Sequence, residues 1–191
     1  MSADGVRIRP IADADWDVIA ALEARAYTRL GLTEGRAALR SRADASPDTC
    51  FVLDVRARPA GYLLALPYPP FAYPHLERTE EPATPAHRHR TDPHPTDPHP
   101  TDLHGTDLHG TNLHLHDIVV AERLRGRGLG QRLLDHLLLT ARTHGFERIS
   151  LIAVGRSERF WSARGFTAHP GIAPGGYGAD AVYMSRVHVP S

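Results

Sequence analysis

The sequence predicts a single α/β domain, on the evidence of three features. A strand, a glycine-rich loop, a long helix and a second strand follow one another between residues 113 and 154. Two apolar runs, at 50–56 and 61–66, are separated by a turn at 58–61 and form a predicted hairpin. The length of 191 residues suits one domain with a single substantial core. We therefore expect residues 1–191 to fold as one unit.

The first part of the chain is predicted to contain a strand and two helices. Residues 6–11 alternate between polar and apolar, as in a half-exposed strand. Asp13 or Asp15 can cap a helix whose apolar stripe runs from Trp16 to Ala26. A second helical stretch covers about residues 33–42. Near the other end of the chain, residues 167–181 are predicted to be mainly loop and residues 181–189 to form the last strand.

The central unit of the chain surrounds the loop at residues 125–130. Residues 115–120 alternate and then become continuously apolar, which predicts a strand that is buried on at least one face. Leucines at helical spacing after the loop predict a helix over 129–141, and Gly145 is placed to end it in a left-handed conformation. Residues 149–154 are predicted to form the next strand.

Three glycines that alternate with other residues at such a junction can curl the backbone around a phosphate. A Walker loop is excluded because it needs a lysine, and the sequence contains none. A dinucleotide fingerprint fits weakly, because it needs the pattern Gly-x-Gly-x-x-Gly, whereas Gly126, Gly128 and Gly130 form Gly-x-Gly-x-Gly. A glycine- and arginine-rich surface turn without a ligand is the remaining alternative.

The loop and its surroundings resemble the acetyl-CoA signature of the GCN5-related N-acetyltransferase (GNAT) superfamily. The resemblance rests on Arg125-x-x-Gly128-x-Gly130 between a strand that ends in Val-Val and a long helix, and it covers residues 113–166. It implies a mixed, mainly antiparallel sheet of about six or seven strands flanked by about four helices, with acetyl-CoA as cosubstrate. The residues carried over are Arg125, Gly126, Arg127, Gly128, Leu129, Gly130 and Gln131 for the phosphates, and Ile118, Val119 and Val120 for pantetheine and the thioester.

Residues 159–166 are similar to a second motif of the same family, a Phe-Tyr-x-x-x-Gly-Phe helix and turn beside the thiol of the cofactor. Many members have a tyrosine there that protonates the leaving thiolate, whereas this chain has Trp161, whose indole is a weak donor. We therefore expect Trp161 to pack against the cofactor. The proton would come from another group, of which Tyr177 and Tyr183 are candidates, or from water, or the thiolate would leave unassisted.

The histidines of His114-Leu115-His116 lie two residues apart, so both side chains are expected on one face of the strand. The arylalkylamine N-acetyltransferases, a branch of the same superfamily, have a similar His-x-His pair that helps to deprotonate the amine. By this resemblance His114 and His116 are candidate catalytic bases, although His114 also continues a tandem repeat. Asp117 is expected on the opposite face, as a hydrogen-bond partner.

That repeat occupies much of residues 75–112, which we expect to form an inserted loop that is rich in histidine and proline and, from its composition, disordered. From Thr91 the chain repeats Thr-Asp-x-His with a period of five residues. Histidines at this period share neither a helix face nor a strand face, so no preformed metal site is predicted. Loose metal binding and replication slippage in a tolerant loop remain as alternatives.

The composition limits the expected partners and compartment. The 22 basic residues, all arginine, balance 22 acidic ones, so net charge gives no argument for nucleic acid. The single cysteine, Cys50, excludes an internal disulfide. No apolar run is long enough for a membrane span, and the cytoplasm is the expected location.

We therefore expect an N-acetyltransferase that transfers an acetyl group from acetyl-CoA to a small-molecule primary amine by direct attack in a ternary complex. The backbone N–H of Val119 or Val120 would polarise the thioester carbonyl. By the resemblance, the first two helices border the acceptor site, and Tyr27 would shape acceptor choice. A non-catalytic acyl-CoA-binding module, a histidine-rich metal-binding protein and a homodimeric state remain open alternatives.

Overall fold

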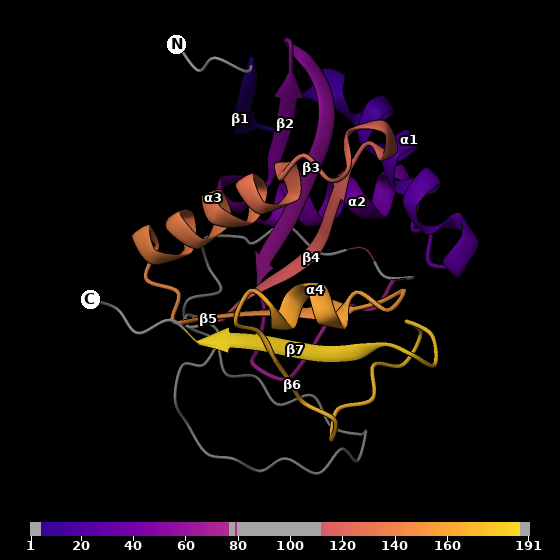
Figure 1. The fold of residues 1–191 in the computed structure, drawn as a ribbon, viewed down its shortest axis with the longest axis vertical. Coiled ribbons are helices and arrows are strands. Elements are labelled where there is room, and N and C mark those ends of the chain that lie inside the picture. Colours follow the sequence, from indigo (N-terminus) through magenta and orange to yellow (C-terminus); the bar gives the residue numbers. More distant parts are fainter. Residues whose placement is uncertain (1–4, 77–78, 80–111, 188–191) are drawn as a thin grey trace.

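The computed structural model describes residues 5–76, 79 and 112–187 (Figure 1). The strands within these ranges are β1 (Val6–Pro10), β2 (Phe51–Val55), β3 (Arg58–Pro67), β4 (Asn112–Val120), β5 (Arg148–Ala153), β6 (Thr167–Ala168) and β7 (Val182–Val187). The α-helices are α1 (Trp16–Tyr27), α2 (Arg36–Ala45), α3 (Leu129–Thr143) and α4 (Glu158–Ser162). Most of the predicted insertion, including the repeat histidines His94, His99, His104 and His109, lies outside the described residues.

The seven strands form one sheet in the order β1-β2-β3-β4-β5-β7-β6. All neighbours pair antiparallel except β4 and β5, which are parallel and are joined through α3. The predicted mixed, mainly antiparallel sheet flanked by four helices is therefore confirmed for the described residues. The short strand β6 lies in a stretch that was predicted to be mainly loop.

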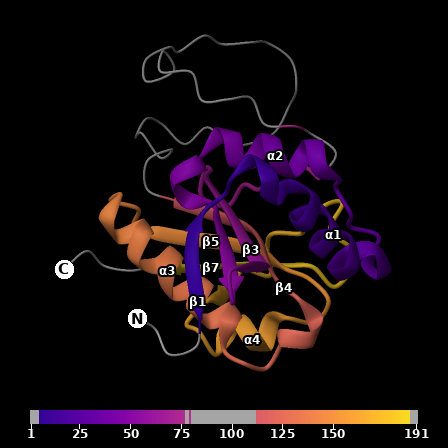
Figure 2. The same cartoon turned by 90° about the horizontal axis from the view of Figure 1, so that it is seen from above.

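The helices cover both faces of the sheet (Figure 2). Helix α3 buries the leucine stripe predicted from the sequence, and it shares one core with Trp161 of α4 and the apolar residues of β3, β4 and β5. Helices α1 and α2 form a second core on the opposite face, with Trp16, Ile19 and Leu39 as buried members. Side chains that alternate along β3 and β4 thus face two different helix layers.

The hairpin turn lies two residues earlier than predicted. Arg56 and Ala57 both have positive φ values, of 52° and 58°, and β3 begins at Arg58. Two consecutive left-handed residues match the right-handed twist of the flanking strands, so they make a tight turn even without glycine. The turn was predicted at 58–61 because proline and glycine favour turns, but Pro59 and Gly61 lie within β3.

Strands β4 and β5 separate in the middle of the sheet. Their parallel pairing extends only from Asn112 opposite Arg148 to Leu115 opposite Leu151. Beyond Leu115, β4 continues to Val120 beside β3 alone, and its course away from β5 is visible in Figure 1. One edge of the second half of β4 is therefore left without a neighbouring strand.

A β-bulge interrupts the pairing of β3 with β4 next to this separation. Leu64 lies opposite Asp117 and Ala65 lies opposite Leu115, so His116 has no partner in β3. An extra residue in one strand shifts the alternation of side chains. Asp117 consequently lies on the same face as His116, toward α1 and α2, and the expectation that it points to the opposite face is wrong.

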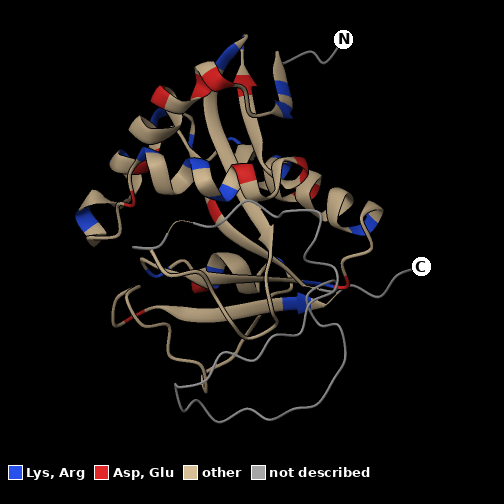
Figure 3. Cartoon of the chain, turned by 180° about the vertical axis from the view of Figure 1, so that it is seen from behind, with Lys and Arg blue, Asp and Glu red and all other residues tan. Residues whose placement is uncertain are grey.

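Charged residues of both signs are interspersed over the helices (Figure 3). None of the helices in the described part of the chain is long and apolar enough to cross a membrane.

Candidate functional site

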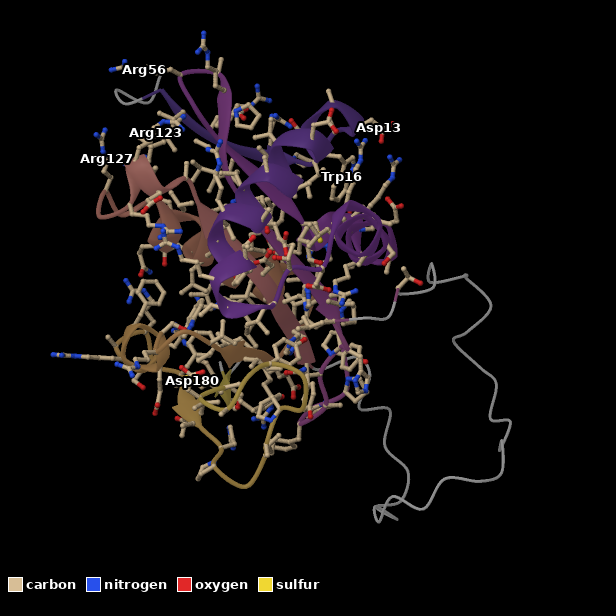
Figure 4. The ribbon with its side chains drawn as sticks, turned by 90° about the vertical axis from the view of Figure 1, so that its right-hand side faces the viewer. Asp13, Trp16, Arg56, Arg123, Arg127 and Asp180 are labelled. Carbon is tan, nitrogen blue, oxygen red and sulfur yellow. The ribbon has the colours of Figure 1, made fainter. Side chains whose placement is uncertain are left out.

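A cleft of about 690 Å³ opens where β4 and β5 separate. It is bordered by the second half of β4, the loop after it, the first turn of α3, the end of β5 and helix α4. Most of the predicted cofactor residues lie on its wall: Ile118, Val119, Val120, Arg125, Gly126, Gly128, Leu129, Gly130, Gln131 and Trp161. Arg127 does not line the cleft, and its side chain points away from the fold (Figure 4).

The glycine-rich loop exposes backbone donors to this cleft. Gly126 and Gly128 have φ values of 77° and 73°, a left-handed conformation that favours glycine. Helix α3 makes its first hydrogen bond from Arg132 N–H to the carbonyl of Gly128, at 3.0 Å, and no side chain of the described residues caps its N-terminus. The preceding N–H groups are open, and together with the helix dipole they suit a diphosphate.

The backbone of β4 also presents groups to the cleft. Ala121 N–H donates to the carbonyl of Ala60 in β3, at 2.8 Å. Because backbone groups alternate along an antiparallel pair, Val119 also faces β3, while Ile118 and Val120 face the cleft. Arg125 Nε accordingly reaches the Val120 carbonyl on that side, at 3.3 Å. Of the two N–H groups predicted to polarise a thioester, only that of Val120 is directed to the cleft.

The opposite wall is formed by α4 and the residues after it. Trp161 is buried and makes edge-to-face contacts with Phe160 and Phe166, with ring centroids 5.0 and 5.4 Å apart. Arg164, which was not among the residues predicted from the sequence motifs, also lines the cleft. Its guanidinium lies 3.4 Å from the Phe160 ring centroid and donates to Gln131 Oε1 at 2.6 Å, so it joins α4 to the first turn of α3.

A second, inner cavity of about 40 Å³ adjoins the cleft on the side of α1 and α2. Its wall consists of Tyr27, Leu32, Glu34, Leu76, His116, Asp117, Ile152, Val154 and Tyr177. Four of these residues, Tyr27, His116, Ile152 and Val154, also line the large cleft. The two spaces therefore meet at this group of four residues.

His116 is held at this junction by two charged residues from the helix layer. Its Nε2 lies 2.8 Å from Arg42 Nε and 2.5 Å from Glu34 Oε1, and Arg42 also forms an ion pair with Glu34. Burial and the Arg42 charge hold the pKa of His116 well below its usual range, so the imidazole is neutral. Burial raises the pKa of Glu34 to about 7, against the opposing effect of Arg42.

Asp117 lies beside His116 as a consequence of the bulge. Its carboxyl group accepts hydrogen bonds from Tyr27 Oη, at 2.6 Å, and from Tyr62 Oη. Burial raises the pKa of Asp117 to about 7, the nearby carboxyl groups of Glu34 and Glu23 add to the rise, and the two phenols oppose it. Glu23 is itself buried and accepts the Glu34 N–H at 2.8 Å.

The other two predicted catalytic residues lie farther from the junction. His114 lines neither of the two cavities; it is buried, and its Nδ1 lies 3.0 Å from Ser150 Oγ. Tyr177 lines the inner cavity only, and its hydroxyl donates to the Pro74 carbonyl at 2.7 Å. Burial raises the pKa of Tyr177 above its usual range. Tyr183 lines neither cavity and accepts the Phe71 N–H.

Sequence reasoning missed four residues that build the site: Glu34, Arg42, Tyr62 and Arg164. The first three come from a loop, a helix and a strand far from His116 and Asp117 in the sequence, and no local spacing relates them. Arg164 lies within the recognised second motif, and its positive charge in a motif expected beside the cofactor was the available signal. Among the described residues, no group of three or more His, Cys, Asp or Glu is placed to hold a metal.

Comparison with known proteins gives one family match. The model of the acetyltransferase (GNAT) family matches residues 16–166. No curated protein matches the sequence.

Solved structures share the fold at low sequence identity. Ard1 from Thermoplasma volcanium is 18% identical with a TM-score of 0.67, and the match covers 97% of this chain and 99% of that one. The GNAT-like decarboxylase GphF, solved with isobutyryl-CoA, is 20% identical with a TM-score of 0.67, over 95% and 98% of the two chains. Naa50 from Arabidopsis thaliana, solved with the bisubstrate analogue CoA-Ac-MVNAL, is 14% identical with a TM-score of 0.60, over 96% and 99%.

Proposed function

This chain belongs to the acetyltransferase (GNAT) family and is an acyl-CoA-dependent acetyltransferase with acetyl-CoA as its cosubstrate, and we propose that its acceptor is the primary amine of a small molecule. The amine would attack the thioester directly in a ternary complex. One observation carries the proposal: the cofactor cleft and the inner cavity meet at His116 and Tyr27, so that an acyl group and an amine can approach each other there.

The cleft has the groups that acetyl-CoA requires. Open N–H groups at the start of α3 and the charge of Arg125 suit the diphosphate, and no side chain competes for those donors. The free edge of β4 at Ile118 and Val120 suits the amide groups of pantetheine. The Val120 N–H would stabilise charge on the thioester oxygen as the tetrahedral intermediate forms.

The acceptor amine must lose a proton before it can attack. An alkylamine has a pKa of about 10 and is almost wholly protonated near neutral pH. His116 supports this step because its ring lies where the cleft and the inner cavity meet. The proton would pass from the amine to the imidazole directly or through water.

Direct attack is supported by the position of the only cysteine. Cys50 is 1% exposed, lies in the core beneath α1 and α2, and contacts the Ala65 carbonyl through Sγ at 3.4 Å. Burial raises the pKa of its thiol to about 12, so the reactive thiolate is scarce. Cys50 is therefore unsuited to carry the acetyl group between the substrates.

Calorimetric titration with acetyl-CoA, with and without EDTA, is the first test. We expect micromolar binding that EDTA leaves unchanged, and absence of binding would contradict the proposed function. A screen of primary amines, beginning with aromatic ones, would follow. His116→Ala should then lower turnover most at low pH, where the amine is most protonated, while acetyl-CoA affinity stays the same; an unchanged pH profile would remove His116 from the mechanism.

Trp161 bears on how the thiolate leaves. The indole lies on the cleft wall at the position of the usual acid and cannot protonate a thiolate near neutral pH. The thiolate would therefore leave unassisted or take its proton from water or from another group.

A further inference from the structure

We propose that the inner cavity selects acceptors that enter as ammonium ions and carry no carboxylate next to the amine, with Asp117 as the residue that receives the ammonium group. This inference rests on the proposed function and specifies its substrate class. It follows from the charges around the cavity, from what those charges already bind, and from the size of the space.

The charges around the cavity are unbalanced. The side chains of Glu23, Glu34 and Asp117 are all buried, and Glu34 connects them, because its N–H donates to Glu23 and its carboxyl group lies beside His116, the neighbour of Asp117. Arg42 is the single cationic side chain among their described hydrogen-bond and ion-pair partners, and none of the cavity-lining residues that the structure describes is an arginine. Buried carboxylates repel one another and lack the solvation that would stabilise their charge. A cation that enters the cavity reduces both the repulsion and the loss of solvation.

Arg42 does not offer a place for a substrate carboxylate. Its guanidinium is fully buried and already contacts three groups: the Glu34 carboxyl, His116 Nε2 and, at 3.0 Å, the His75 carbonyl. A guanidinium presents five N–H donors in a fixed plane, and these contacts hold it in one orientation behind the cavity wall. A carboxylate on the acceptor would thus face acids without a compensating cation.

Asp117 is oriented to receive a cation. Each of its carboxyl oxygens accepts one phenol hydroxyl, one from Tyr27 on α1 and one from Tyr62 on β3. A carboxylate oxygen has a second lone pair, so both oxygens keep capacity for an ammonium N–H. The two phenols fix the carboxyl group without neutralising it, since phenols with raised pKa values stay protonated.

The volume of the cavity limits what surrounds the amine. About 40 Å³ admits on the order of three water-sized groups, which corresponds to the nitrogen and the carbon atoms nearest to it. Leu32, Leu76, Ile152 and Val154 form apolar parts of the wall, which suits those carbons. A carboxylate on the carbon that bears the amine would therefore lie inside the cavity, among the buried acids.

Two matched sets of acceptors test the inference with the wild-type full chain and acetyl-CoA. The first set is phenethylamine, phenylalanine and phenylalanine methyl ester, and the second is butylamine, norvaline and norvaline methyl ester. Each ester is larger than its amino acid but lacks the negative charge. We expect kcat/KM for the amines and esters to exceed that for the amino acids by at least about 100-fold.

The variant Asp117→Asn tests the role of the charge at nearly constant shape. It should lower kcat/KM for phenethylamine by about 100-fold, reduce the preference for phenylalanine methyl ester over phenylalanine, and leave acetyl-CoA affinity unchanged. The control is Asp54→Asn, which removes another buried carboxylate, one that pairs with Arg9 and lines neither cavity. This control should keep the preference of the wild-type protein.

The outcomes separate this inference from the proposed function. Equal kcat/KM for phenylalanine and its methyl ester would overturn the inference and leave the proposed function intact. A preference that Asp117→Asn does not change would equally overturn the role of Asp117. Acetyl-CoA binding without acetylation of any of the six compounds would overturn the proposed small-molecule amine acceptor, and the inference with it.

Discussion

At the scale of single residues, the carboxyl group of Asp117 links stability to pH. Its pKa is raised to about 7, so between about pH 4 and pH 7 the folded protein holds a proton that the unfolded chain releases. The stability that this group contributes is fully present below about pH 4 and is lost as the pH rises through about 7. An ammonium acceptor would bind best when Asp117 is ionised, whereas the folded state is most stable when Asp117 is protonated.

The first prediction follows from this linkage. Asp117→Asn removes the titrating group, so the free energy of unfolding of the variant relative to wild type should rise between about pH 5 and about pH 8. Urea denaturation at the two pH values measures the difference. Asp15→Asn is the control: Arg9 lowers the pKa of Asp15 below its usual value, so this variant should be destabilised similarly at both pH values.

The substitution Gly130→Ala tests the proposed diphosphate site without straining the backbone. It lies within α3, and a Cβ at this position would have no atom within 4 Å. Gly130→Ala should therefore preserve stability or raise it by about 0.5–1 kcal/mol, because alanine is the better helix former. The added methyl group would stand where the diphosphate approaches, and acetyl-CoA affinity should fall about tenfold or more.

Thermal unfolding and calorimetric titration of Gly130→Ala measure the two effects separately. Gly171→Ala is a matched control, since a Cβ there is equally free and the residue lines neither cavity. Normal acetyl-CoA affinity in Gly130→Ala would place the diphosphate elsewhere. A bulky residue at Gly128 is a poorer test, because the φ of 73° would strain any side chain.

At the scale of elements, the bulge in β4 shows where the regular alternation of side chains along a strand no longer predicts which face a residue occupies. Residues two apart in a regular strand share a face, and the rings of His114 and His116 do lie together as expected, with centroids 6.4 Å apart. The same rule misplaced Asp117, because one unpaired residue shifts every later side chain to the other face. A bulge depends on the fit between two strands, and neither strand alone carries a clear signal for it.

The contact between α3 and α4 supports another prediction at this scale. Arg164→Ala removes the hydrogen bond to Gln131 and the stacking on Phe160, so the α4 wall of the cleft would lose its tie to the phosphate loop. Acetyl-CoA affinity should fall about tenfold. Arg159→Ala, at an exposed position on α4, should bind acetyl-CoA normally. Equal titration curves for the two variants would exclude this role of Arg164.

At the scale of the whole molecule, the sheet depends little on the length of the segment between β3 and β4. Pro67 pairs with Leu113, so the two strands meet where this segment leaves and re-enters the sheet. Deletion of residues 91–110 should change the free energy of unfolding by less than about 1 kcal/mol, since loop closure depends weakly on length. Acetyl transfer should be largely retained, and its loss would show that the repeat takes part in the reaction.

The fold was more predictable than the site. Strands, helices and the phosphate loop follow from local periodicity and glycine placement, and residues near 113–166 carried most of that signal. The acid cluster required contacts between residues such as Glu34 and His116, which are 82 positions apart. Such pairs form only when α2 packs on the sheet, and nothing in their local sequence indicates the partner. Tyr62 and Asp117 are likewise distant in sequence, and they meet only through the pairing of β3 with β4.

The free edge of β4 has a consequence for how this molecule can change over evolutionary time. The groups that it would offer to pantetheine are main-chain groups, which are the same for almost every amino acid. A cofactor that is held in this way tolerates drift in the side chains around it, provided that the strand keeps its course. Selection on the acceptor would then act on a separate set of residues, those of the helix layer.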